Sequence, residues 1–430
     1  MVLELVVFFL IVIPPIFRKK IYCLYLIVTL IPFHSFIKYF FALNGGGDVF
    51  SYWKEIVILI FIFKAFNHNQ RKLNNYFLGY FILLICFLSL YIFVNLENLN
   101  YGLAKFRDIV FPILLFLGIS VSNIKESQIR KFVYLFSLSF LIIGITGIMD
   151  VFFGYRDVFA LVTGKIEAIG IDGEKYYPAS MMIMGFNRMT GILEGPNQLG
   201  LYASTFILLI VGLKGKYKWE NFKDKFVAGT AIFGIFVLLF SFSRTAIATV
   251  MISLFFLFNN KRTYKNLFVI FLVVILTSGV LSFFFPQIQD VYLGTLQGKE
   301  ASSADRSNNF QQGINFILKQ PLGHGLGSSH PNKTGETQVY FAESTFINLC
   351  VEIGISGFLL LMGYYLLVLH KLKRFRGDLP KISSAILITT LITSFFSVNP
   401  SESLYTYIIW IIIGFSFSKI IKDVKYENIG

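Results

Sequence analysis

Charged residues are scarce in this chain of 430 amino acids: only 14% are Asp, Glu, Lys or Arg, whereas 55% are hydrophobic. An ordinary soluble domain has about a quarter charged residues. The deficit excludes a water-soluble globular protein of the usual kind and favours a chain that lies mostly in a membrane.

Cysteine is also rare. Cys23, Cys86 and Cys350 lie far apart, each within an apolar run. An odd number of cysteines in such positions argues against a disulfide framework and against a zinc site. We therefore assign them no functional role.

Nucleotide-binding motifs are missing as well. The sequence has no Walker A motif, no dinucleotide-binding glycine motif and no Asp-x-Asp pair. The net charge of +14 comes from Lys and Arg residues that punctuate apolar segments instead of forming one basic face. These features argue against an enzyme that uses nucleotide sugars in the cytoplasm and against a nucleic-acid partner.

Long apolar runs are abundant, and they predict about thirteen (12–14) transmembrane helices. The expected fold is an all-α polytopic integral membrane protein with a single membrane domain over residues 1–430. Arg18, Lys19 and Lys20 follow the first run, whereas a secretory signal has its basic residues before the apolar stretch, so this run reads as a retained helix. The expected spans are 2–17, 21–43, 55–66, 76–94, 109–122, 132–154, 198–213, 227–242, 245–258, 267–285, 345–369, 382–398 and 404–421.

Basic residues concentrate in alternate loops between these spans, which hold 25 of the 38 Lys and Arg residues. The positive-inside rule places these loops in the cytoplasm, with the N-terminus outside and the C-terminus inside. The two longest loops, 155–197 and 286–344, then lie outside the membrane. Because loops of this length usually carry function or are disordered, we look for a site there.

The second long loop contains a predicted amphipathic helix, with Phe310, Ile314 and 316–317 on or near one face. A Pro-Leu-Gly-His-Gly-Leu-Gly segment follows at 321–327. Its glycines allow a turn that brings backbone N–H groups close to an anionic oxygen. Glycine-rich loops are common, so this segment alone is a weak signal.

Four short motifs follow one another over residues 185–370. They are Arg-Met-Thr-Gly with a later Pro-Asn, Ser-x-Ser-Arg-Thr, Arg306 with Pro-Leu-Gly-x-Gly-x-Gly, and Glu-Ser-x-x-x-Asn-Leu-x-x-Glu-x-Gly-x-x-Gly. In this order the segment resembles the O-antigen polymerase and ligase superfamily. The resemblance implies a glycosyltransferase C-like membrane enzyme that uses undecaprenyl-diphosphate-linked glycans, with no metal and no other cofactor.

One departure from the family pattern is informative. Ligases of this superfamily usually carry a histidine and an asparagine at the start of the helix after the large loop, where this chain has Glu343 and Ser344. The difference favours the polymerase branch. The odd number of predicted helices also departs from the even number often drawn for the family.

Arginine is suited to hold a lipid diphosphate, because its planar fork binds phosphate oxygens in pairs and stays protonated. Transfer from a diphosphate develops negative charge on the leaving group, which cations stabilise. Arg188, Arg244 and Arg306 are expected near helix ends on the outer side, and we predict that they bind the diphosphate. The alternative for each is an interfacial arginine that snorkels or forms a salt bridge.

The attacking sugar hydroxyl also needs a base. Glu343 is the first candidate because it precedes a helix after the long loop, and Glu194 and His324 follow. The alternative for either carboxylate is a charge favoured by a helix N-terminus. Inside a span, Glu352 reads as a structural partner, with Arg244 as one possibility.

The remaining motif residues have structural readings. Pro196 marks the point where the first loop turns back into a helix, with Asn197 as a plausible N-cap. Gly323, Gly325, Asn348 and Gly354 belong to the family-like motifs.

The function expected is polymerisation of lipid-linked repeat units at the outer face of a bacterial plasma membrane. Expected partners are the bilayer, the undecaprenyl-diphosphate-linked donor and acceptor, and a chain-length regulator and flippase of the same pathway. Two alternatives stay open: a flippase or transporter of lipid-linked oligosaccharide, and a ligase that transfers a finished glycan to another acceptor. Transporters often show internal repeats, and none is visible in this sequence.

Overall fold

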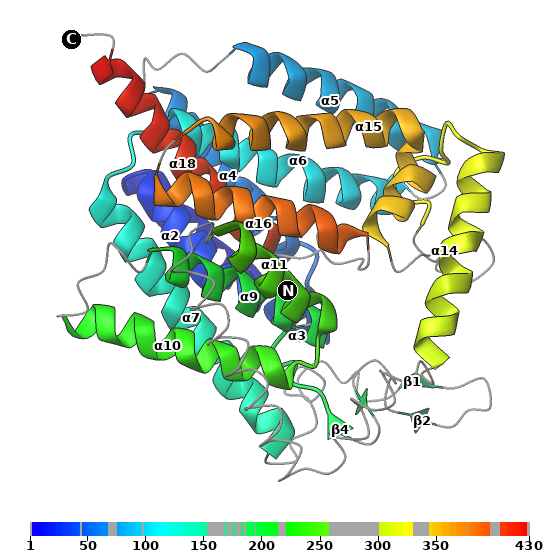
Figure 1. Ribbon diagram of the computed structural model, residues 1–430, viewed down its shortest axis with the longest axis horizontal. Coiled ribbons are helices and arrows are strands. Elements are labelled where there is room, and N and C mark those ends of the chain that lie inside the picture. The colour runs from blue at the N-terminus through cyan, green and yellow to red at the C-terminus, as the bar shows by residue number, and fades with distance from the viewer. Residues whose placement is uncertain are drawn as a thin grey trace. The chain divides into compact units, whose positions relative to one another are not determined.

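The computed structural model is predominantly helical, and its contacts divide the chain into two compact units, described separately below (Figure 1). Unit 1 comprises Met1–Lys64 with Ile124–Gly298, and unit 2 comprises Ala65–Asn123 with Lys299–Gly430. The residues that the structure describes are 2–43, 45–67, 75–96, 99–152, 168–169, 175–176, 182–183, 186–193, 195–213, 221–257, 301–329, 344–375, 377–395 and 405–427.

Unit 1 is built around α9, which packs against α7, α10 and α11, while α2 packs against α7. An aromatic cluster fills its interior, in which Phe140 stacks on Phe206 with ring centroids 4.6 Å apart. The helices are α1 (Val2–Phe17), α2 (Ile21–Leu30), η1 (Ile31–Phe33), α3 (His34–Leu43), η2 (Phe50–Tyr52), α4 (Trp53–Asn67), α7 (Glu126–Phe152), α9 (Pro196–Leu213), α10 (Phe222–Phe240) and α11 (Arg244–Leu257).

Unit 2 holds α15 (Thr345–Lys373), which packs against α5 (Asn75–Val94), α14 (Ala301–Lys319) and α16 (Asp378–Ser394). It also holds α6 (Leu99–Val121) and α18 (Tyr405–Glu427), which pack against each other. In Figure 1, α14 runs crosswise to α5 and α15, beside the end of α15 where that helix changes direction.

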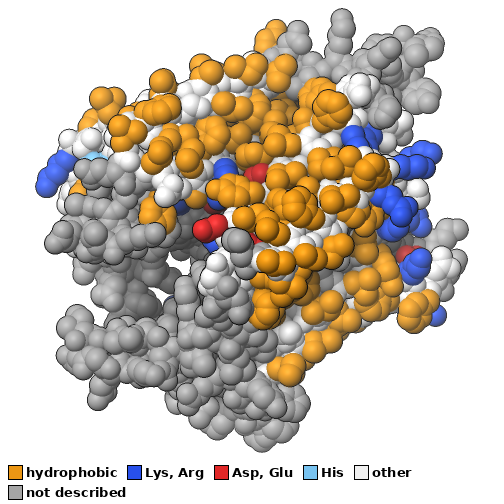
Figure 2. Space-filling model, turned by 180° about the vertical axis from the view of Figure 1, so that it is seen from behind, with side chains coloured by type: hydrophobic (Ala, Val, Ile, Leu, Met, Phe, Trp, Pro, Cys, Tyr) orange, Lys and Arg blue, Asp and Glu red, His pale blue; other side chains and the backbone are white. Residues whose placement is uncertain are grey.

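Within the part of the chain that the structure describes, five helices are long and apolar enough to cross a membrane: Ile21–Ala42, Tyr76–Val94, Glu126–Met149, Pro196–Leu213 and Thr345–Lys373. Hydrophobic side chains also cover much of the described surface on the face in Figure 2. Leu10 is 69% exposed and Phe93 is 67% exposed. Apolar surface of this extent needs an apolar covering, and the surface therefore fits a membrane protein.

Each predicted span coincides with a helix, except 267–285, which lies outside the described residues. Three corrections concern the details. The expected span 21–43 is found as the candidate span Ile21–Ala42, but it is not one regular α-helix, because a 3₁₀ turn at Pro32 lies within it. The span expected at 109–122 begins at Leu99, so that Lys105 lies inside α6 and is only 8% exposed. Charged residues such as Lys105 lower the mean hydropathy of this segment, so the first half of the helix was not predicted.

The third correction concerns the first long loop, 155–197. It contains two short antiparallel hairpins, so the chain is not helical throughout. β1 (Ala168–Ile169) pairs with β2 (Lys175–Tyr176), and β3 (Met182–Ile183) pairs with β4 (Phe186–Asn187).

The predicted amphipathic helix is α14, but its apolar residues do not share one packed face. Phe316 and Ile317 pack against Ile347 and Val351 of α15. Phe310, Ile314 and Leu318 are exposed instead, at 43%, 41% and 70%.

Candidate functional site

Arg188 is the centre of a polar cluster in unit 1, which we call the arginine cluster (Arg188, Asn197 and 241–244). The Nε of Arg188 donates to the carbonyl of Ser241 at 3.0 Å, and Nη2 donates to Asn197 Oδ1 at 2.9 Å and to the carbonyl of Phe242 at 3.3 Å. This half-buried guanidinium therefore joins the start of α9 to the turn between α10 and α11.

The start of α9 confirms the predicted break at Pro196, which occupies the first position of the helix. Proline is suited to this position because its fixed φ is helical and its missing N–H would be unsatisfied there. Asn197 lies one residue inside the helix, so its predicted role as an N-cap is wrong. Its side-chain oxygen accepts the hydrogen bond from Arg188.

The turn after α10 is held in a rare conformation. Phe242 has φ +48°, a left-handed value that costs a residue with a Cβ about 1–3 kcal/mol. Ser243 then caps α11, because its Oγ accepts from the N–H of Ala246 at 3.4 Å. Gly200 of α9 fits closely against this turn, since a Cβ there would lie 2.7 Å from the Cβ of Ser243.

Arg244 is the first residue of α11, and its side chain is exposed. A guanidinium at a helix N-terminus adds its charge to the positive end of the helix dipole. The arginine cluster therefore presents a cation on a fixed turn, which favours contact with an anionic group.

The end of the first long loop is packed into unit 1. Met189 and Thr190 are 0% and 2% exposed. Gly191 has φ +61°, and a Cβ there would lie 2.7 Å from the carbonyl oxygen of Ile143 in α7. This packing holds in place the backbone of the segment that contains Arg188.

Unit 2 contains a second cluster around the segment 320–329, which we call the glycine loop. It lies against a break in α15, where Gly354 has φ +69° and ψ +175°. The break frees backbone groups that a continuous helix would pair. The N–H groups of His324 and Gly325 donate to the carbonyls of Val351 and Glu352, both at 2.8 Å, and Ile355 N–H donates to Pro321 O at 3.0 Å.

The glycines of this loop are required by close backbone approach. A Cβ on Gly325 would lie 2.6 Å from the Cβ of Asn95. A Cβ on Gly327 would lie 2.6 Å from the amide nitrogen of Gly102 in α6. The expected flexible turn is thus a tightly packed segment, whose N–H groups at His324, Gly325 and Leu326 bond to protein carbonyls. The proposed capture of an anionic oxygen by these N–H groups does not fit this packing.

Several polar side-chain atoms gather beside the glycine loop. The hydroxyl of Ser329 donates to Oε1 of Glu352, a residue that is 1% exposed. Ser329 is therefore the partner found for Glu352, where the sequence suggested Arg244. Glu352 Oε2, His324 Nε2 and Ser328 Oγ are buried and have no hydrogen-bond partner among the described residues. Burial lowers the pKa of the His324 imidazole below its ordinary value, which favours the neutral form.

Other predicted site residues are described only in part. Glu194 and Glu343 lie outside the described residues. Arg306 lies in α14, but its side chain is not described. Asn348 is 3% exposed in the first turn of α15. Ser344 caps this helix by accepting from the N–H of Ile347 at 3.4 Å.

The charged run in α6 was not among the predicted site residues. Gly102 of α6 lies close to the backbone carbonyl of Leu326 in the glycine loop. The charged residues that follow it in the helix are Lys105, Arg107 and Asp108. Lys105 is three residues from Gly102 and therefore lies near it on the helix surface. Three charged residues within four positions of an apolar helix were the available signal.

A family model described as O-antigen ligase matches residues 229–362. The matched segment is about a third of the chain, and it supports a relation to the O-antigen ligase and polymerase superfamily. It confirms the resemblance expected from the motif order. No curated protein sequence matches the chain.

The O-antigen ligase match begins within α10 and ends within α15, and it includes Arg244, the glycine loop and Glu352. Arg188 and Asn197 precede it. Members of this superfamily are glycosyltransferase-like enzymes of polysaccharide biosynthesis that act on lipid-linked glycans in a membrane. The structure adds what the match does not contain: the hydrogen bonds through which Arg188 holds the turn before Arg244.

Proposed function

We propose that this protein is a metal-independent polymerase that joins undecaprenyl-diphosphate-linked oligosaccharide repeat units at the outer face of a bacterial plasma membrane. Support comes from the O-antigen ligase match over 229–362 and from the helices long and apolar enough to cross a membrane. The Glu343-Ser344 pair, where ligases usually have histidine and asparagine, favours the polymerase over the ligase.

In this reaction a hydroxyl oxygen of the acceptor glycan attacks the anomeric carbon of the donor glycan. The new carbon–oxygen bond replaces the bond between that carbon and the diphosphate oxygen. Undecaprenyl diphosphate leaves with the bonding electrons, and the hydroxyl proton passes to a base. The protein must therefore stabilise a diphosphate anion and accept a proton.

The observation that carries the proposal is the way in which the arginine cluster presents Arg244. Arg188 donates to the carbonyls of Ser241 and Phe242, and Gly200 lets the turn pack closely against α9. Arg244 is exposed on this fixed turn at the start of α11. We assign diphosphate contact to Arg244 and Arg306, and we assign Arg188 to positioning the turn as well as to the local positive charge.

Two residues of unit 2 are proposed as the base. Glu343 directly precedes the N-cap of α15, and a carboxylate there benefits from the helix dipole. The Nε2 of His324 has no hydrogen-bond partner among the described residues, and the lowered pKa keeps its ring neutral near pH 7. A neutral imidazole accepts a proton, so His324 fits this role chemically. Glu194 stays a third candidate.

A reconstituted assay tests the function. Purified protein in liposomes is supplied with diphosphate-linked repeat units, and the products are separated by length. A ladder of longer lipid-linked glycans that disappears in Arg244→Ala supports the polymerase. Movement of the substrate across the bilayer without lengthening would instead identify a flippase. Consumption of finished polymer with transfer to another acceptor would identify a ligase.

A further inference from the structure

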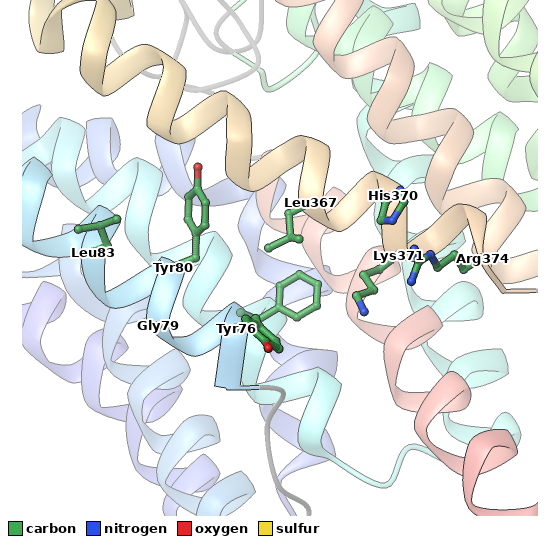
Figure 3. Close-up of a pocket in the computed structure, with 9 residues that line it drawn as sticks. Tyr76, Gly79, Tyr80, Leu83, Leu367, His370, Lys371 and Arg374 are labelled. Carbon is green, nitrogen blue, oxygen red and sulfur yellow. The ribbon is translucent and has the colours of Figure 1, made fainter.

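Unit 2 contains a groove between the start of α5 and the end of α15 (Figure 3). Its volume is about 630 Å³, which lies in the range of small-molecule and lipid sites. It is lined by residues of α5 and α15 and by one residue directly after α15: Tyr76, Phe77, Gly79, Tyr80, Leu83, Leu367, His370, Lys371 and Arg374.

Charged and apolar groups are segregated along this groove. Figure 3 shows His370, Lys371 and Arg374 together at the C-terminal end of α15. Leu367 lies on α15 beside this group, and Leu83 lies on α5 further from it. No acidic side chain is among the described residues that line the groove. A cationic end that continues into an apolar channel matches a molecule with an anionic head and a hydrocarbon tail.

Gly79 borders open space in the groove, and Tyr80 ties the two helices together. A Cβ on Gly79 would meet nothing within 4 Å, so the absence of a side chain leaves this space empty. The hydroxyl of Tyr80 donates to the carbonyl of Leu360 at 2.9 Å, which ties α5 to α15. The cavity is therefore built into the packing of the two helices.

We propose that this groove binds one anionic phospholipid, with the phosphate at Lys371 and Arg374 and an acyl chain beside Leu83 and Leu367. Basic pockets between membrane helices recognise anionic headgroups in this way. Tyr76, which is 82% exposed at the first turn of α5, supplies an aromatic ring at headgroup level. On the topology expected from the charge pattern, the lipid belongs to the cytoplasmic leaflet.

A simpler explanation exists for the basic residues alone. Cations near a helix C-terminus are favoured by the helix dipole, and basic residues gather on the cytoplasmic side of membrane proteins. Neither effect requires a groove with an apolar extension. Lys373 at the end of α15 and Lys381 near the start of α16 provide the comparison, because both are exposed and neither lines the groove.

The test is a lipid titration followed by native mass spectrometry of the full-length protein after delipidation in detergent. The probes are phosphatidylglycerol and phosphatidylcholine with identical acyl chains. We expect one phosphatidylglycerol to bind in preference to phosphatidylcholine. Lys371→Gln with Arg374→Gln should weaken it about 10- to 30-fold, whereas Lys373→Gln with Lys381→Gln, which removes the same charge, should weaken it less than threefold, a ceiling on the order of half a kcal/mol.

Gly79→Leu separates the groove from its charge, since it fills the empty space and leaves every cation in place. We expect this variant to lose phosphatidylglycerol binding while its elution profile and thermal unfolding stay as in the parent protein. The proposal is overturned if both double variants weaken binding equally, if Gly79→Leu binds normally, or if inorganic phosphate displaces the lipid at equal concentration. The last result would identify a phosphate site without an acyl chain.

Discussion

Gly323 and Gly354 approach each other so closely that a Cβ on Gly323 would lie 2.4 Å from the amide nitrogen of Gly354. The glycine loop thereby enters the break in α15 and supplies the hydrogen bonds that the helix loses there. The glycine loop and the motif around Gly354, which are separate in the sequence, therefore pack as one structural element in the folded chain.

Gly354→Ala should therefore destabilise the protein. Alanine would have to adopt φ +69°, and its Cβ would lie 2.4 Å from the carbonyl oxygen of Leu322. The left-handed conformation alone costs about 1–2 kcal/mol. Gly229→Ala in α10 is the matched control, because a Cβ there meets nothing within 4 Å. Thermal unfolding in detergent should fall only for Gly354→Ala, and equal unfolding temperatures would contradict this role of the break.

Arg188→Ala should lower both stability and polymer formation. The variant leaves the carbonyls of Ser241 and Phe242 and the amide of Asn197 without their donor, at a cost of about 1–3 kcal/mol. Displacement of the turn before Arg244 should reduce polymer on the order of a hundredfold. Asn197→Asp retains an acceptor oxygen for Arg188 and should keep most of the activity. If Arg188→Ala has the same unfolding temperature as the parent protein, the hydrogen bonds of Arg188 do not stabilise the turn.

Arg244→Ala should strongly reduce polymer and should change the unfolding temperature less than Arg188→Ala does, because this side chain is exposed at the start of α11. The loss expected from removing one charge-stabilising group is on the order of 100-fold. Arg244→Lys should recover little, since an ammonium cannot make the paired contact of a guanidinium. Arg130→Ala is the control, because Arg130 is an exposed arginine of unit 1 that faces Glu126 at 3.8 Å. Normal chain length in Arg244→Ala would remove Arg244 from the site.

His324 should make the protein less stable in acid. Burial holds the pKa of its imidazole below 6.5, so the unfolded chain takes up a proton that the folded chain does not. Stability is therefore complete above pH 6.5 and falls as the pH drops toward the folded pKa. His324→Gln should unfold at more similar temperatures at pH 7.5 and 5.5 than the parent protein does. His370→Gln, which changes an exposed histidine of α15, should keep the parent's dependence.

The same residue gives a test of the base. If His324 accepts the proton, the rate of polymer formation should rise with pH through a pKa below 6.5 and then become constant. This rise, the acid limb of the pH profile, should be absent in His324→Gln, and most of the rate should be lost as well. A limb that survives in His324→Gln but disappears in Glu343→Gln would assign the base to Glu343 instead. Initial rates at saturating substrate between pH 5 and 8 provide the measurement.

Much of the helical framework could be predicted from sequence, because each helix is specified by its own apolar run and by local signals. Val2–Phe17 forms α1 as expected, and Pro196 begins α9, since proline fits the first turn. The order of the short motifs was likewise sufficient to recognise the superfamily that the O-antigen ligase match confirms. The first half of α6 was not predicted, because its charged residues lower the mean hydropathy and a buried Lys105 is thereby counted as a loop residue.

What the tertiary structure decided is which distant groups meet. Arg188 and Asn197 are separated by a few residues, but the turn that Arg188 holds lies more than fifty residues further along the chain. The break in α15 exists as a stable feature because the glycine loop replaces its lost hydrogen bonds, and the N–H of His324 bonds to Val351. Sequence patterns report local conformation and the side that a residue faces, whereas such hydrogen bonds depend on backbone groups that only the folded chain brings within reach.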